Sequence, residues 1–321
     1  MWTGNLLLAI LAALLIDRAV GEPLMVWRRL PHPVVLIGRG IERLERGLRD
    51  AGDPPKRQLR LGRLVILGVT AGGLLVGWLL QAALLALPLG WLWLGLVMST
   101  LFAQKSLIDH VSAVAVGLGR GVEAGRQAVA LIVGRDTSSL DGPAIGRAAT
   151  ESLAENLSDG VIAPLLWSLL LGLPGLLAYK IVNTADSMIG HRTPRHLHFG
   201  RAAARLDDFL SWLPARITAW MIVVCAFGMG SAKGARRVMR ECARLHRSPN
   251  AGWPEAAMAG ALGLRLSGPR VYAGEPTDEP WVGDGTARVG PAELRRALRL
   301  ADRVWALALL LTLGLWSLGL A

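Results

Sequence analysis

The sequence predicts an all-α integral membrane protein, a polytopic helical bundle with long cytoplasmic loops and amphipathic helices. Of its 321 residues, 52% are hydrophobic and only 18% are charged, and the mean hydropathy is +0.41. An ordinary soluble protein is less apolar than this. The stretch 64–104 holds no charged residue over 41 positions, and one membrane span needs roughly 20. The third observation is charge placement: the 35 Lys and Arg residues lie between the apolar runs and leave a net charge of +11.

The predicted spans follow in order, within a single membrane domain covering 1–321. The first apolar segment is interpreted as a retained span that ends near Asp17, because MWTGN lacks the positive start of a signal peptide. Pro88 and Gly90 predict a turn between two spans of one helical hairpin. The segment 161–179 contains two Pro and two Gly residues, so it is either a full span or a broken or re-entrant segment packed in protein. The expected spans are about 2–20, 64–86, 88–106, 161–179, 209–231 and 304–321.

The polar segments between the spans show weaker patterns. An amphipathic helix is expected over 106–133, and residues 139–141 are expected to cap a helix running through Asn156. A short helix is expected over 255–264, and 272–290 is expected to be a loop. The two cysteines form no CxxC pattern, which argues against a disulfide framework or a structural zinc site. No nucleic-acid-binding signature accompanies the basic charge, so membrane topology explains it better.

Three acids stand where a polar helix runs into an apolar segment. Glu151, Glu155 and Asp159 are spaced i, i+4, i+8 and would share one helical face. A solvated acidic face is the simple interpretation. Acids close to lipid are costly and are usually functional, however, and carboxylates suit Mg²⁺, which binds through one or two of them together with substrate phosphates. The pattern predicts a magnesium site.

A second polar run lies at 180–200. Asn183 and Asp186 fall within one helical turn, and His191 and Arg192 follow before Pro194, which is expected to end the helix. The alternatives are a capped helix end with a polar loop and a group that handles phosphate and metal. The pair His196 and His198 is only a weak zinc signal.

Two further stretches carry candidate residues. Asp17 and Glu22 stand where the first span ends, and His32 lies between two prolines. The stretch 248–263 is rich in small residues that let a backbone approach a ligand closely. The common phosphate-binding signatures GxxxxGK[ST] and GxGxxG are missing, so a nucleotide would not be bound by one of those folds.

Together these stretches resemble the adenosylcobinamide-phosphate synthase family, the membrane amide-forming enzymes of cobalamin biosynthesis. The resemblance covers about 17–285 and rests on five motifs in order: GEPLMVWRRLPHPVVLIG, GRDTSSLD, ESLAENLSDGVIAPL, NTADSMIGHR and SPNAGWPEAAMAGALG. It implies a ligase that joins (R)-1-aminopropan-2-ol or its O-phosphate to a propionate of adenosylcobyric acid. ATP would activate the carboxylate, most simply as an acyl phosphate, with Mg²⁺ as the metal.

The resemblance also implies site residues and surroundings. Positions in its motifs are assigned by chemistry: catalytic groups Asn183, Asp186, His191 and Arg192, magnesium ligands Glu151, Glu155 and Asp159, and substrate-binding groups Asp17, Glu22, His32, Arg135, Asp136, Asn156, Ser248, Asn250, Glu255 and Tyr272. The enzyme is expected in the inner membrane, in contact with lipid and not nucleic acid, with its active site facing the cytoplasm. Other membrane enzymes of late cobalamin biosynthesis are candidate partners. A non-enzymatic membrane sensor or scaffold and an anion or corrinoid transporter are the competing interpretations.

Overall fold

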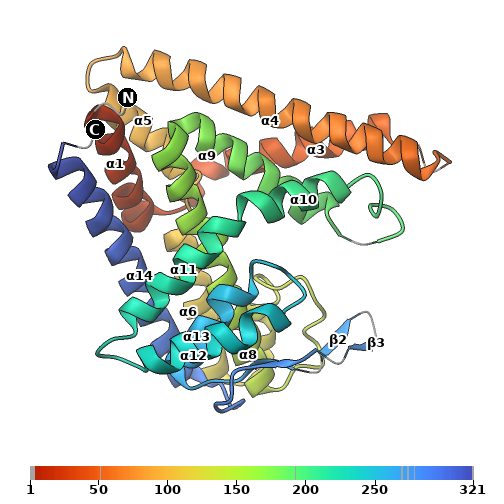
Figure 1. The fold of residues 1–321 in the computed structure, drawn as a ribbon, viewed down its shortest axis with the longest axis vertical. Coiled ribbons are helices and arrows are strands. Elements are labelled where there is room, and N and C mark those ends of the chain that lie inside the picture. The colour runs from red at the N-terminus through yellow and green to blue at the C-terminus, as the bar shows by residue number, and fades with distance from the viewer. Residues whose placement is uncertain are drawn as a thin grey trace. The chain divides into compact units, whose positions relative to one another are not determined.

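The computed structural model describes residues 4–50, 52–191, 193–268, 270–272, 275–277 and 279–319, and helices dominate it (Figure 1). The prediction of an all-α membrane protein is confirmed. Three helical segments in the described residues are long and apolar enough to cross a membrane: Pro55–Leu85, Gly90–Arg120 and Gly142–Ile189. The consecutive helices Arg201–Leu210 and Trp212–Cys225 pass the same test when they are counted as one span. Which helices cross the bilayer stays a prediction.

The chain forms two compact units. Unit 1 contains the described residues of Met1–Ala103, Ala163–Ser211 and Thr312–Ala321. Its helices are α1 (Gly4–Val20), α2 (Leu24–Trp27), α3 (Pro33–Leu48), α4 (Pro55–Leu85), α5 (Gly90–Ser99), α9 (Ala163–Ile189) and α10 (Arg201–Leu210). Within this unit α1 packs against α5, and α4 packs against α9.

Unit 2 contains Gln104–Ile162 and Trp212–Leu311. Its helical elements are α6 (Gln104–Arg120), α7 (Val122–Val129), α8 (Gly142–Leu157), the π-helical turn η1 (Ser158–Ile162), α11 (Trp212–Cys225), α12 (Ala232–Cys242), the 3₁₀ turn η2 (Ala243–Leu245), α13 (Gly252–Leu262) and most of α14 (Pro291–Ser317). Two short antiparallel pairs complete it: β1 (Leu266–Ser267) with β4 (Trp281–Val282), and β2 (Arg270–Tyr272) with β3 (Glu275–Thr277).

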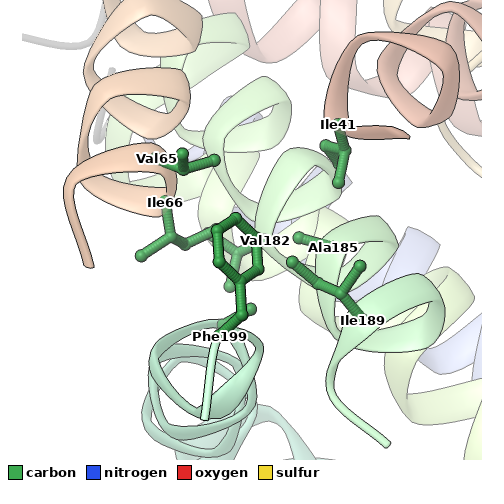
Figure 2. Packing of buried hydrophobic residues seen from close by; sticks show 8 residues of the cluster. Ile41, Val65, Ile66, Val182, Ala185, Ile189 and Phe199 are labelled. Atoms are coloured by element: carbon green, nitrogen blue, oxygen red, sulfur yellow. The ribbon is translucent and has the colours of Figure 1, made fainter. Parts of the chain in front are cut away.

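A hydrophobic core in unit 1 determines which side of α9 remains for polar chemistry. Figure 2 shows Ile41 of α3, Val65 and Ile66 of α4, and Phe199 gathered around the α9 side chains Val182, Ala185 and Ile189. These three α9 positions recur at helical spacing, so they occupy one face of the helix. Asn183 and Asp186, which are also three residues apart, therefore lie together on a different face.

The segment 161–179 is helical but broken. Gly172 inside α9 has φ 70° and ψ −151°, a conformation that favours glycine. The break exposes the backbone N–H of Leu173, which donates to the side-chain oxygen of Gln81 on α4 at 2.8 Å. A polar residue in the uncharged stretch 64–104 thus satisfies a donor that lipid could not.

The structure corrects several expected boundaries. The helix expected over 106–133 is divided at Gly121, whose φ of 145° no other residue type adopts easily, into α6 and α7. Helix α9 ends at Ile189, before Pro194. The expected loop 272–290 contains β3 and β4, because pairs of only two or three residues leave little periodic signal. The predicted cap of α8 is confirmed, since the Asp141 carboxylate accepts the N–H of Ala144 at 2.8 Å.

Candidate functional site

In unit 1 a polar pair joins α9 to α10. The side-chain amide of Asn183 donates to the Asp207 carboxylate at 3.2 Å. Asp207 is 8% exposed, so its carboxylate is nearly removed from water. Burial of a carboxylate is costly without hydrogen bonds, and the Asn183 amide supplies one.

Asp186 lies close to this pair. Asp207 and Asp208 interact electrostatically with it, as does His191. Its carboxylate lies directly against the backbone of Gly190, where any side chain would collide with it. Glycine at this position therefore lets the helix end fold back over an acid. Asn183, Asp186 and His191 are brought together as predicted, while Arg192 lies outside the described residues.

The segment that follows, 190–200, is fastened to α3. Glu45 is 3% exposed and accepts two hydrogen bonds from the Arg195 guanidinium, at 2.7 and 3.1 Å, and one from Arg49 at 2.7 Å. These donors hold the pKa of the Glu45 carboxyl below its usual range. The His196 ring nitrogen lies 3.8 Å from the same carboxylate, and burial lowers the pKa of that imidazole. Neither Glu45 nor Arg195 was predicted from the sequence.

The N-terminal candidates have separate structural settings. Asp17 is 3% exposed within α1, and Glu22 is exposed. His32 caps α3 by accepting the N–H of Val34 at 3.2 Å, and its ring packs edge-on against Trp27 with centroids 4.6 Å apart. Burial lowers the pKa of the His32 imidazole, and the nearby Glu22 carboxylate opposes that shift.

Unit 2 contains the acids predicted to hold magnesium. Glu151 is 7% exposed, and its two carboxylate oxygens accept from different donors: the backbone N–H of Ser267 at 2.8 Å and the Arg135 guanidinium at 3.5 Å. Glu155 is exposed and Asp159 is half-buried. No group of three or more His, Cys, Asp or Glu side chains in the described ranges is arranged to hold a metal ion.

The helical register changes at these acids. Glu151 and Glu155 belong to α8, whereas Asp159 belongs to the π-helical turn η1. π-Helical turns are rare, and those that do occur are frequently at functional sites. Asn156 donates to the Ser152 carbonyl at 2.9 Å, one turn earlier in α8.

The remaining predicted residues have mainly local partners. Asp136 is exposed and closes a turn by accepting from the N–H and hydroxyl of Ser138, which lowers the pKa of its carboxyl. Ser248 accepts the N–H of Ala251 at 3.2 Å. The side chains of β2, including Tyr272, lie outside the described part of the chain.

Asn250 and Glu255 lie near the start of α13 and are both buried. The Asn250 side chain accepts from the Arg216 guanidinium at 2.7 Å, and that guanidinium lies 4.7 Å above the ring of Trp253. Glu255 lies 3.7 Å from His246. Two polar side chains of 248–263 are thus buried, and each has a basic partner from outside this stretch.

Comparison with known proteins then identifies the family. The sequence matches the family described as CobD/Cbib protein over residues 10–301. The chain belongs to the CobD/Cbib family. The resemblance inferred from the five motifs is thereby confirmed.

Curated relatives in this family span nearly the whole chain. The cobalamin biosynthesis protein CobD of Rhizobium meliloti is 49% identical over 297 residues, which cover 91% of this chain and 90% of the relative. The protein of the same name from Rhodobacter capsulatus is 47% identical over 322 residues, covering 98% and 99%. No solved structure matches this chain.

Proposed function

We propose that this chain acts in cobalamin biosynthesis as an ATP-dependent ligase that forms an amide bond. Its substrates would be adenosylcobyric acid and (R)-1-aminopropan-2-ol or its O-phosphate, and its product adenosylcobinamide or the phosphate. Support comes from membership of the CobD/Cbib family and from relatives named cobalamin biosynthesis proteins that align along nearly the full length. The reaction and its substrates are inferred from the family resemblance together with the candidate site.

One observation supports this chemistry best: the group formed by Asn183, Asp186 and Asp207. It joins α9 to α10. Helix α9 belongs to the segment Gly142–Ile189, which is long and apolar enough to cross a membrane, and α10 is so only when counted together with α11. Ionisable groups in such helices are costly and are usually retained for function. A structural helix end needs fewer hydrogen-bonding groups than this.

The group suits the amine substrate. Carboxylates can bind its ammonium group, and Asp186 or His191 can take one proton from it so that the nitrogen lone pair becomes free to attack. The attack on an acyl phosphate then forms the C–N bond and releases inorganic phosphate. Arg192 or Arg135 is proposed to neutralise phosphate charge during these steps.

Magnesium would accompany ATP. The donor set fits a metal that is carried by the nucleotide, because such Mg²⁺ needs only one or two protein carboxylates. Exposed Glu155 and half-buried Asp159 on η1 are the first candidates. Glu151 ranks behind them, because its oxygens already accept from Arg135 and Ser267. Bound Mg²⁺ would supply charge neutralisation at the phosphates.

The test is direct assay of the purified protein in detergent. Adenosylcobyric acid, MgATP and each of the two amines are incubated with it, and the corrinoid products are separated by mass. We expect an amide product with one amine preferred, and release of ADP and phosphate in equal amounts. Intact corrinoid with no ATP use would reject the ligase and leave a sensor, scaffold or transporter.

Variants link the activity to the proposed group. Asn183→Ala and Asp186→Asn should lower the rate by roughly 10²-fold or more, the scale for losing one electrostatic stabiliser. Ser187→Ala is the matched control, because Ser187 is exposed on the same helix and its hydroxyl donates to the Asn183 carbonyl of that helix at 2.9 Å. If both variants kept the wild-type rate, the group would have only a structural role and the proposed catalytic role would be rejected.

A further inference from the structure

Two arginines in unit 2 have buried donors without hydrogen-bond partners. Nε of Arg135 and Nε of Arg265 are both inaccessible to water, and within the described ranges neither donates to any acceptor. The Arg135 side chain is 10% exposed. Buried N–H groups of native proteins are nearly always paired, so each exception requires an explanation.

The two arginines belong to one continuous set of contacts. Arg135 contacts one oxygen of Glu151, and the other oxygen of Glu151 accepts the N–H of Ser267. Ser267 in β1 pairs with Trp281 in β4. The guanidinium carbon of Arg265 lies 4.5 Å from the centroid of the Trp281 ring.

A third arginine lies beside the same ring. The guanidinium carbon of Arg147, four residues before Glu151 on α8, is 5.4 Å from the Trp281 centroid. It also donates to the carbonyl of Ala287 at 2.9 Å. Trp281 therefore brings the guanidinium groups of Arg147 and Arg265 to one ring. Arg135 is connected to that ring through Glu151 and Ser267.

The backbone at Ser267 is held in an uncommon conformation. Its φ is 58°, in the left-handed region that non-glycine residues seldom adopt. At the next residue, Gly268, a Cβ would approach the Trp281 ring to 2.7 Å. Surrounding contacts must maintain this turn, and they fix both the N–H that binds Glu151 and the ring that supports Arg265.

The contact between Arg135 and Glu151 is long: Nη2 of Arg135 lies 3.5 Å from a Glu151 oxygen, compared with the roughly 2.7–2.9 Å of a strong charge-assisted hydrogen bond. Arg265 contacts only the ring of Trp281 through its side chain, among the interactions that the described residues make. A guanidinium presents a planar fork of donors that matches the oxygens of a phosphate. The donors left over thus suit an oxyanion.

We propose that Arg135 and Arg265, flanked by Arg147, bind a phosphate group, and that Glu151 is a positioning residue for Arg135. The source of that phosphate rests on the proposed function: it belongs either to the nucleotide or to the phosphorylated amine. The site itself requires only the contacts in unit 2.

Direct binding tests the site without relying on catalysis. The full chain in detergent is titrated by calorimetry with MgATP, with (R)-1-aminopropan-2-ol O-phosphate, and with the unphosphorylated amine. Arg265→Ala and Arg265→Lys should weaken binding of one phosphorylated ligand by roughly tenfold to a hundredfold, the cost of a lost charge-assisted hydrogen bond. Arg265→Lys keeps the positive charge and so serves as the control for misfolding of the Ala variant. The ligand affected identifies the source.

Arg288→Ala is the control, because it removes the same charge from an exposed position of unit 2. Glu151→Gln should weaken the same ligand less than Arg265→Ala does. Equal affinities in Arg265→Lys, Arg265→Ala and Arg288→Ala for both phosphorylated ligands would overturn the proposal. Binding that depends on Arg265 in a chain that forms no amide would support the phosphate site and reject the ligase.

Discussion

At the scale of single residues, two buried acids have different surroundings and so different expected roles. Glu45 is surrounded by cations from α3 and from the segment 190–200, which suits a fastening role. Glu151 accepts the backbone N–H of Ser267 and contacts the Arg135 guanidinium at 3.5 Å, which suits a positioning role. Sequence position alone does not separate these roles, because Arg195 lies 150 residues from Glu45 and Ser267 lies 116 residues from Glu151.

The first residue-scale prediction concerns magnesium. Activity is measured against Mg²⁺ concentration for Glu155→Gln and Glu151→Gln. If Glu155 is a ligand, its variant should need more Mg²⁺ and lose roughly 10²-fold in maximal rate. If Glu151 instead positions Arg135, its variant should keep the Mg²⁺ midpoint and show weaker binding of a phosphorylated ligand. Unchanged curves for both variants would place the metal elsewhere.

The second residue-scale prediction concerns the ion pairs that hold the segment 190–200 to α3. Glu45→Gln removes the charge that binds Arg195 and Arg49 and should cost roughly 1–3 kcal/mol of unfolding free energy. The pKa of Glu45 is lowered by these partners, so its contribution is fully present above the unfolded carboxyl pKa of about 4.3 and disappears as pH falls through the lower folded value. Thermal unfolding of both proteins between pH 7 and 3 should therefore converge at the acidic end.

Glu42→Gln provides the comparison for that experiment. Glu42 lies on the same helix but is exposed, with its Arg46 partner one turn away. Exposed pairs of this kind contribute about 0–1 kcal/mol. A Glu42 variant as unstable as the Glu45 variant would remove the special role of the buried carboxylate.

At the scale of elements, the break in α9 depends on its neighbour α4. Gly172 supplies the backbone conformation, and Gln81 accepts the N–H that the break exposes. From the Pro and Gly residues of 161–179, the sequence allowed either a full span or a broken segment, and the structure shows the break at Gly172. The partner was not predictable, because Gln81 lies 92 positions from Leu173 and no local pattern connects them.

Gln81→Leu tests this pairing. The substitution keeps the approximate size of the side chain but leaves the Leu173 N–H unpaired in an apolar setting, at a cost of roughly 1–3 kcal/mol. We expect a lower unfolding temperature in detergent and easier proteolysis near residue 172. Leu80→Ala, at an exposed neighbouring position, should change little. Equal stability of Gln81→Leu and the wild type would show that another group satisfies the break.

The same difference, between local signals and partners far apart along the chain, determines how much of the candidate site could be predicted from the sequence. Asn183 and Asp186 were found because they stand three residues apart at a helix end. Asp207 was missed, although it also stands at the threshold of an apolar run, where the reasoning applied to Glu151 would have found it. Arg265 and Trp281 had no local signal, since their arrangement depends on pairing between two very short strands.

At the scale of the whole molecule, charge distribution predicts orientation. The segments 21–63 and 233–299 hold 22 of the 35 Lys and Arg residues. Cytoplasmic segments are enriched in these residues, so both are expected to face the cytoplasm. The helical hairpin of α4 and α5 would return the chain to the same side for 105–160. The proposed use of ATP requires this orientation.

The final prediction tests that orientation with single cysteines. Arg57 and Arg288 are exposed, and each lies within one of the two basic segments. In a background lacking Cys225 and Cys242, Arg57→Cys and Arg288→Cys should resist a membrane-impermeant maleimide added to intact cells and react after the membrane is opened. The apolar turn between α4 and α5 offers the opposite control, because Leu87→Cys should react from outside. Labelling of Arg57→Cys and Arg288→Cys in intact cells, with Leu87→Cys protected, would reverse the topology and place the proposed ATP chemistry on a side without ATP.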